Sequence, residues 1–203
     1  MKLSSIATVK TGLVLNRKMA KNGNQVICQY LQLNLKSVQE EGFIERSLLE
    51  KFESTGKLKA EYLTKPGDIV LRLTTPYTAV LIDETVSGIV ISSYFVVIRV
   101  NDDKVLPEYL YWYLNTDKVK RIIAKNISSS MIGTVKPTQI AELNIDVLEL
   151  EEQRKIADLN FLSKQEMLLL ERLKGQKELY YKEIMNHIYN EKRKKQNGND
   201  NQK

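Results

Sequence analysis

Positive charge is concentrated at the start of the chain. Residues 1–39 contain six basic side chains and no carboxylate, and these six equal the whole formal net charge of +6. They are Lys2, Lys10, Arg17, Lys18, Lys21 and Lys36. Cations grouped with polar and aromatic residues can bind a polyanion such as DNA or RNA. The alternative is a solvated basic face, which is common in a protein with a pI near 9.2.

Side chains suited to catalysis or metal binding are sparse. The chain has one histidine, His187, and one cysteine, Cys28, far apart in the sequence. A zinc site needs more ligands of these types, and no phosphate loop of the GxxxxGK type occurs. We therefore predict no catalytic site, no metal and no cofactor in this chain. A lone cysteine favours a reducing compartment and no segment reaches membrane-spanning length, so we expect a cytoplasmic protein without membrane contact.

Residues 1–150 show short strand-like and helix-like patterns in turn, which predicts one domain of the α+β class. Branched and aromatic residues between turn signals predict strands at residues 26–35, 69–73, 78–83, 88–100 and 143–148. Within 88–100, the pair Ser92-Ser93 marks either a bulge or a break between two strands. Helical segments are expected at 50–57, from Pro107 onward, at 117–125 and at 137–141, and residues 2–9 fit a helix or a strand.

A long helix is predicted over residues 151–195, which contain no proline and one glycine, Gly175. Apolar residues recur in it at steps of three and four, as on one helix face. They are Ile156, Leu159, Leu162, Leu169, Leu170, Leu173, Tyr180, Ile184 and Ile188. At ~1.5 Å per residue this helix is roughly 65 Å long, so its own domain cannot cover the far half. Residues 196–203 are too polar to fold and are expected to form a disordered tail.

Three residues interrupt this apolar stripe: Ser163, Glu166 and Lys177. Polar residues within a pairing stripe can fix the register or direction of a helix pair. The alternative is that they mark positions that no partner covers. A lone exposed helix would leave the stripe in water, so we favour pairing.

Several short features follow one another along the chain. The C-terminal half has Leu110-Tyr111-Trp112-Tyr113-Leu114, then Gly133-Thr134, residues 140–147, and Glu152-Gln153-Arg154-Lys155-Ile156-Ala157 opening the long helix. The N-terminal half has Leu3, Ile6, Ala7 and Gly12, and then Gly67-Asp68-Ile69-Val70. In their order and spacing, these features resemble the specificity subunit of type I restriction-modification systems. Two departures stand out. The usual prolines before the long helix are replaced by Val147-Leu148-Glu149-Leu150, and there is one recognition domain and one long helix where the family usually has two of each.

The resemblance implies a half-size subunit that reads DNA. In the family, two long helices pair as an antiparallel coiled coil and separate two target-recognition domains, each reading half of a bipartite site. A single-domain chain is then expected to form a homodimer, since a two-fold dimer is the commonest closed assembly. The other expected partners are double-stranded DNA and the modification (methyltransferase) and restriction subunits, which would bind S-adenosylmethionine and ATP.

A DNA-reading domain needs donors and acceptors for base edges and cations for phosphates. Four polar segments offer them: Asn16, Arg17, Lys18, Lys21 and Asn22; Arg72, Thr74, Thr75 and Tyr77; Ser92, Ser93 and Tyr94; and Ser128, Ser129, Ser130, Met131 and Thr134. Arg17 and Arg72 are the candidates for a bidentate contact to guanine. Alternatives stay open: Lys18 and Lys21 as solvated charges, Arg72 in a salt bridge, and Ser92-Ser93 as a bulge.

Two other functions fit the same sequence. One is a coiled-coil scaffold whose globular head binds protein, and the other is an RNA-binding module. Salt-dependent binding to duplex DNA distinguishes a DNA reader from a scaffold. Preference for a bipartite duplex over single strands distinguishes it from an RNA-binding module.

Overall fold

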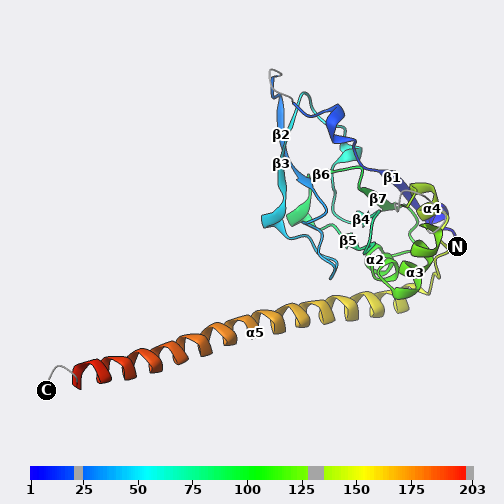
Figure 1. Cartoon of the computed structure of the whole chain (residues 1–203). Helices are drawn as coiled ribbons and strands as arrows, with labels where there is room; N and C mark the ends of the chain where they lie inside the picture. The colour runs from blue at the N-terminus through cyan, green and yellow to red at the C-terminus, as the bar shows by residue number, and fades with distance from the viewer. Residues whose placement is uncertain (21–24, 128–134, 200–203) are drawn as a thin grey trace. The chain divides into compact units, whose positions relative to one another are not determined.

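The computed structural model describes residues 1–20, 25–127 and 135–199 (Figure 1). The chain divides into two compact units, Met1–Asp158 and Leu159–Lys203. The first unit holds both β-sheets and all helices except most of the last one. The mixed sheet and helix content agrees with the expected α+β class.

A four-stranded antiparallel sheet forms the centre of the first unit, with strands in the order β1(Ala7–Thr11), β7(Phe95–Val100), β4(Ile69–Arg72) and β5(Ala79–Leu81). β4 and β7 lie in the middle, and residues 69–71 and 95–98 are buried without exception. Alternate residues of these strands face two different cores, since Leu71 and Val96 belong to one cluster and Val70 and Val97 to another. Burial on both faces explains why these strands are apolar throughout rather than alternating.

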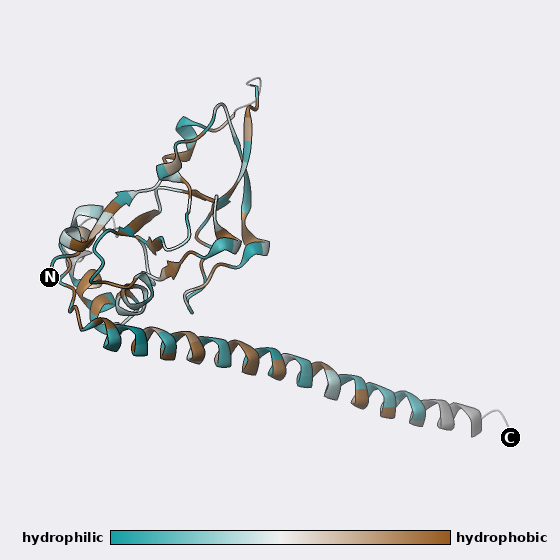
Figure 2. Ribbon diagram, turned by 180° about the vertical axis from the view of Figure 1, so that it is seen from behind, coloured by the Kyte–Doolittle hydropathy of each residue, from teal (hydrophilic) through white to brown (hydrophobic). Residues whose placement is uncertain are grey.

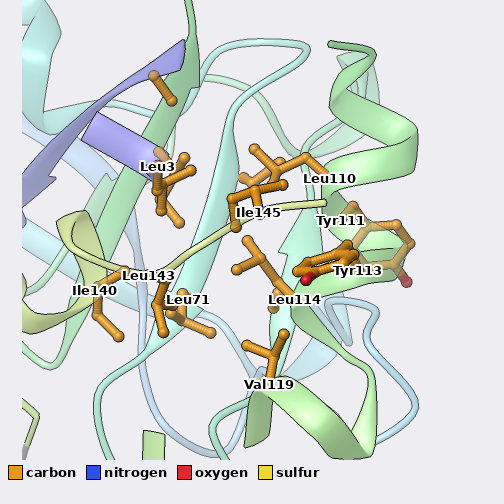
Figure 3. Packing of buried hydrophobic residues seen from close by; sticks show 14 of the residues in the cluster. Leu3, Leu71, Leu110, Tyr111, Tyr113, Leu114, Val119, Ile140, Leu143 and Ile145 are labelled. Atoms are coloured by element: carbon orange, nitrogen blue, oxygen red, sulfur yellow. The ribbon is translucent and has the colours of Figure 1, made fainter. Parts of the chain in front are cut away.

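One face of this sheet is covered by short helices, α1(Leu3–Ile6), α2(Pro107–Leu114), α3(Asp117–Ile127) and α4(Pro137–Ala141). Figure 3 shows Leu110 and Leu114 of α2 among Leu71 of the sheet and Ile140 and Leu143. α2 and α4 both begin at a proline, the residue best suited to a first helical position. Helical segments were expected at all three positions from Pro107 to residue 141, and these expectations are confirmed.

A second, three-stranded sheet covers the opposite face, in the order β3(Glu50–Ser54), β2(Cys28–Leu33) and β6(Val90–Ile91). β2 is antiparallel to β3 and parallel to β6. Leu33 and Ile91 of this sheet share a core with Val70 and Val97 of the first. Since β6 and β7 belong to different sheets, residues 88–100 form two strands that break at Ser92-Ser93, one of the two outcomes expected there.

The turn before β4 is fixed by a carboxylate. Gly67 has a φ of 82°, which glycine adopts without strain. The next residue, Asp68, accepts two hydrogen bonds from the Arg99 guanidinium, each 2.9 Å long, and one from the Lys65 amide at 3.0 Å. Arg99 lies on β7, so Asp68 ties the start of β4 to its neighbour strand. The same guanidinium donates to the Leu63 carbonyl oxygen, at 3.0 Å.

Two expected elements are wrong. Residues 50–57 were expected to be helical, but 50–54 form β3, with Phe52 and Ser54 buried and Phe52 opposite Tyr30. Residues 143–148 were expected to form a strand, but only one isolated bridge occurs there, between Lys2 and Asn144. The Asp146 carbonyl oxygen accepts its hydrogen bond from the Tyr109 hydroxyl, at 2.6 Å, and not from the backbone of a neighbouring strand. In both cases the deciding partner lies far away in the sequence.

The side chain of Tyr111 ties α2 to the loop before β3. Its hydroxyl donates to the Gly42 carbonyl oxygen at 2.7 Å, and both groups are buried. Burial raises the pKa of Tyr111 to about 12, so the hydroxyl keeps its proton and remains a donor at neutral pH. This contact spans 69 residues of sequence.

The long helix α5(Leu150–Asn199) begins one residue before its expected start and continues past Lys195, so four residues of the expected tail are helical. Residues 200–203 lie outside the described part of the chain. Ile156 was expected in the pairing stripe, but it packs against the core of the first unit. The other stripe residues are exposed, from 37% for Ile184 to 69% for Leu159. Apolar and polar residues alternate along the ribbon of α5 in Figure 2. Among the described residues, no helix is both long and apolar enough to cross a membrane.

Gly12 provides a test of the packing between the two sheets. A Cβ at this position would lie 2.2 Å from the Ser92 carbonyl oxygen and 2.5 Å from that of Ile91. Both are backbone atoms, so Gly12→Ala should lower the free energy of unfolding by about 1–3 kcal/mol in urea denaturation. The matched control is Gly56→Ala, because a Cβ there meets nothing within 4 Å; it should change stability by less than about 1 kcal/mol. Equal effects of the two substitutions would contradict the close approach.

Candidate nucleic-acid interface

Three polar segments meet at one edge of the four-stranded sheet. In the antiparallel register Thr11 lies opposite Val96 and Arg72 lies opposite Phe95, so β1 and β4 end where β7 begins. The segments that follow β1, follow β4 and precede β7 are residues 12–18, 73–78 and 92–94. We call these three segments the loop edge. Three of the four segments predicted to contact DNA therefore begin or end at this edge.

Backbone hydrogen bonds hold the loop edge together. The Leu13 amide donates to the Ile91 carbonyl oxygen at 2.7 Å, and the Ser93 amide donates back to the Leu13 carbonyl oxygen at 2.9 Å. The Leu73 amide donates to the Tyr94 carbonyl oxygen, also at 2.9 Å. These bonds satisfy loop backbone groups that would otherwise need water, so the segments are ordered by the sheet.

Val135 is the first described residue after the fourth predicted segment. The Val135 amide donates to the Leu73 carbonyl oxygen at 3.1 Å, which brings residue 135 to the loop edge. The predicted contact residues of this segment lie outside the described residues: Ser128, Ser129, Ser130, Met131 and Thr134. Lys21 and Asn22 also lie outside them.

Several predicted contact residues are exposed at the loop edge. Asn16, Arg17 and Lys18 are exposed at the short 3₁₀ turn η1(Leu15–Arg17), which follows β1. Thr75 is exposed, Thr74 and Ser93 are partly exposed, and Tyr94 is 56% exposed. The edge therefore offers two cations, an amide, hydroxyls and an aromatic ring, which are the groups that contact bases and phosphates.

Two predicted contact residues are buried instead. Tyr77 is 8% exposed and belongs to the core on the helix-covered face, and its hydroxyl accepts a hydrogen bond from Thr75 Oγ1 at 3.2 Å. Its φ of 54° is uncommon for a residue with a side chain. Ser92 is 1% exposed, because the backbone at Gly12 covers it. Neither side chain is open to a ligand. The prediction that Tyr77 and Ser92 contact DNA is therefore corrected, and both residues are assigned to the support of the loops.

Arg72 holds the loop edge to the small sheet. Its Nε donates to Thr74 Oγ1 at 3.0 Å and its Nη1 to the Leu35 carbonyl oxygen at 3.3 Å. The side chain is half-buried, so these hydrogen bonds give it a structural role. Arg17 is exposed at η1, and of the two arginines it is the more open to solvent. Contact of either arginine with guanine stays a prediction.

The basic N-terminal segment does not act as one patch. Lys2 forms an ion pair with Glu142, and Lys10 forms one with Glu61. The hydrogen bond from Lys10 lowers the pKa of the exposed Glu61 carboxyl. Arg17 and Lys18 are the basic residues of this segment that the structure places at the loop edge.

Another cation was missed by sequence reasoning. The Thr55 amide donates to the Lys18 carbonyl oxygen at 3.0 Å, so the end of β3 adjoins η1. Lys57, two residues further on, is exposed and adds positive charge close to Lys18. Because residues 50–57 were expected to be helical, Lys57 was not grouped with Lys18. The signal that could have found it is the alternation of Phe52 and Ser54 with charged residues, which is typical of a half-buried strand.

Comparisons with known proteins agree on one family. The sequence matches the model of the type I restriction modification DNA specificity domain over residues 1–179. No curated protein matches it. The fold is similar to the HsdS subunit from Thermoanaerobacter tengcongensis, with a TM-score of 0.64 and 17% identity over 87% of this chain and 44% of that one. It is also similar to a chain in a study of complex assembly and conformational transition of the type I R-M system, with a TM-score of 0.61 and 15% identity over 91% of this chain and 42% of that one. The chain thus spans less than half the length of either.

The different settings of the two arginines predict different effects on stability. Arg72→Ala removes two hydrogen bonds from a half-buried guanidinium and leaves the Leu35 carbonyl without that donor. It should lower the free energy of unfolding by about 1–3 kcal/mol in urea denaturation. The matched control is Arg17→Ala, which should change it by less than about 0.5 kcal/mol because the side chain is exposed. A destabilising Arg17→Ala with a neutral Arg72→Ala would reverse these assignments.

Proposed function

The chain belongs to the type I restriction modification DNA specificity family, and we propose that its first unit reads one half of a bipartite DNA site. The observation that carries this proposal is the loop edge. Exposed Thr75 and Tyr94 lie there, and the segment that carries exposed Asn16, Arg17 and Lys18 leads from it to the end of β3. The family match indicates DNA as the ligand, and the loop edge is the surface that we propose binds it.

The exposed groups divide by chemistry into those that read bases and those that hold the backbone. Arg17 can donate two parallel hydrogen bonds to guanine, and Asn16 can pair with adenine through its amide. Lys18 and Lys57 suit phosphate oxygens, which fix position without reading sequence. The Tyr94 hydroxyl suits phosphate or sugar. Arg72, Tyr77 and Ser92 then keep these segments in place from below.

The long helix is proposed to pair antiparallel with a second copy as a coiled coil. Beyond Asp158 its apolar residues are exposed, including Leu159, Leu170, Leu173 and Ile184. A group of exposed apolar residues of this size is typical of an interaction site. Pairing of two copies would provide two recognition domains, one for each half of a bipartite site. The length of the paired helices would then set the spacing between the half-sites.

Methyl transfer and DNA cleavage are proposed to belong to separate subunits. The modification subunit would bind S-adenosylmethionine and dock on the long helix, and the restriction subunit would bind ATP. This chain then supplies sequence recognition and spacing without a catalytic site of its own. Support comes from the family match and from the likeness to a chain of a type I R-M system.

DNA binding is tested with the sequence methylated by the complex of this chain and a copurified methyltransferase subunit. Arg17→Ala should weaken binding to that duplex about 5- to 100-fold and relax the preference at one base pair, since a bidentate guanine contact contributes ~1–3 kcal/mol. Lys18→Ala should weaken all duplexes equally and reduce the slope of log Kd against log salt by about 1. Both are measured by fluorescence anisotropy over a series of salt concentrations.

The control for these variants is Lys2→Ala, which removes a basic residue of the same N-terminal segment that is paired with Glu142, outside the loop edge. It should leave duplex binding unchanged. Unchanged affinity and base preference in Arg17→Ala would contradict the proposed contact. Tighter binding to single-stranded RNA would favour an RNA-binding module, and absence of nucleic-acid binding would favour a scaffold. A continuous methylated site would contradict two paired half-site readers.

Helix pairing is tested by placing a charge in the apolar stripe. Leu170→Glu should convert a dimer to a monomer in analytical ultracentrifugation, because burying an unpaired carboxylate in an apolar interface is unfavourable. The matched control is Gln165→Glu, which adds the same charge five residues earlier and about 140° around the helix. Gln165 is exposed and lies outside the stripe. A monomeric parent chain, or a dimeric Leu170→Glu variant, would contradict pairing through this stripe.

A further inference from the structure

Gln153 makes three hydrogen bonds from a completely buried side chain, with 0% of the residue exposed. Its Oε1 accepts a hydrogen bond from the Leu106 amide at 2.9 Å. Its Nε2 donates to the Lys104 carbonyl oxygen and to the Leu148 carbonyl oxygen, both at 2.7 Å. Both donor hydrogens and the acceptor of the amide are thus used inside the protein.

These three bonds join the beginning of the long helix to two other segments. Lys104 and Leu106 lie in the connection from β7 to α2, and Leu106 is the residue that caps α2. Leu148 lies in the extended stretch just before α5, where no proline restrains the backbone. The side chain therefore fixes the first turn of α5 to the domain and fixes the approach to that turn.

An amide is the side chain that suits this position. It presents one acceptor to a backbone N–H and two donors to two backbone carbonyls. A carboxylate of the same shape would face both carbonyl oxygens without a hydrogen to share. An apolar side chain would leave these three partly buried backbone groups without this partner, which is unfavourable.

The next turn of α5 is held by packing. Ala157 lies one turn after Gln153 and is 7% exposed, and Ile156 packs against the core of the first unit. Gln153, Ile156 and Ala157 fall at helical spacing on one face. The second unit begins at Leu159, and most of the residues from there to Glu191 are exposed. The described attachment of α5 to its recognition domain is therefore confined to its first two turns.

Because the attachment is short and the helix is long, the direction of α5 is sensitive to small rotations at its first two turns. From Asp158 to Asn199 a helix extends ~60 Å. A rotation of roughly 10° at the attachment would move the far end by roughly 10 Å, since ~1.5 Å per residue accumulates along the helix. Duplex DNA rises ~3.4 Å per base pair, so this displacement corresponds to about three base pairs.

We propose that Gln153 is a positioning residue that sets which spacing between half-sites the paired protein accepts. The proposal rests on the proposed function, in which each domain reads one half-site and the paired helices separate the domains. Gln153 lies outside the loop edge and acts on DNA choice through the direction of α5. A variant with a looser attachment should bind each half-site normally and discriminate less between spacings.

The test uses the full chain and three duplexes that carry the methylated bipartite sequence, one with its natural spacing and two with one base pair added or removed. The parent protein should bind the natural spacing at least tenfold more tightly than the other two. Gln153→Ala should reduce this preference at least fivefold. Its affinity for a duplex with a single half-site should change less than twofold. Gln153→Asn keeps the amide on a side chain one methylene shorter, and should reduce the preference in the same direction if Gln153→Ala does not fold.

Asn115→Ala is the matched control. The Asn115 amide also makes three hydrogen bonds inside the first unit, accepting from the Ala79 amide and donating to the carbonyl oxygens of Ala79 and Tyr111. Its loss should destabilise the domain and keep the preference for the natural spacing. A folded Gln153 variant that keeps the parental preference would overturn the proposed role. A parent protein that shows no preference among the three duplexes would instead contradict the proposed function.

Discussion

The pairing of β7 with β1 on one side and β4 on the other is the constraint on which the recognition domain depends. Both ladders are antiparallel, so β1 and β4 end at the edge where β7 begins. β4 and β7 are buried on both faces, which ties their register to two cores at once. A shift of the register by one residue would turn the side chains of these strands to the opposite face of the sheet. Leu71 and Val97 would then each point into the other core. The position of every loop at the edge follows from that register.

Burial divides the polar residues at this edge into two groups. Arg72, Tyr77 and Ser92 lie beneath the surface and fix the loops through hydrogen bonds or packing. Thr75 and Tyr94 of the same segments, and Asn16 and Arg17 at η1, remain exposed. Placing exposed groups on a supported backbone is what binding surfaces need, because ordering loops on binding would oppose affinity. Recognition of different sequences could then arise from exchange of the exposed residues while the buried ones stay.

The long helix combines two roles that are separated along its length. Its first turns belong to the domain, through the buried amide of Gln153 and the packing of Ile156 and Ala157. The residues after Asp158 present apolar side chains to solvent and suit a partner. One continuous helix therefore carries both the end of a domain core and an exposed apolar segment.

The sequence by itself determined the elements whose signals are local: the long helix, the strands at 69–73 and 78–83, and the helices that begin at Pro107 and Pro137. Periodicity, turn residues and proline at a first helical position act over a few neighbours, so a sequence displays them. The tertiary structure alone decided that 50–54 form a strand, that 143–148 do not, that Tyr77 and Ser92 are buried, and that Ile156 packs against the core. It also decided that Arg72 supports the loop edge while Arg17 is open to solvent. These outcomes depend on partners dozens of residues away, which local patterns do not specify.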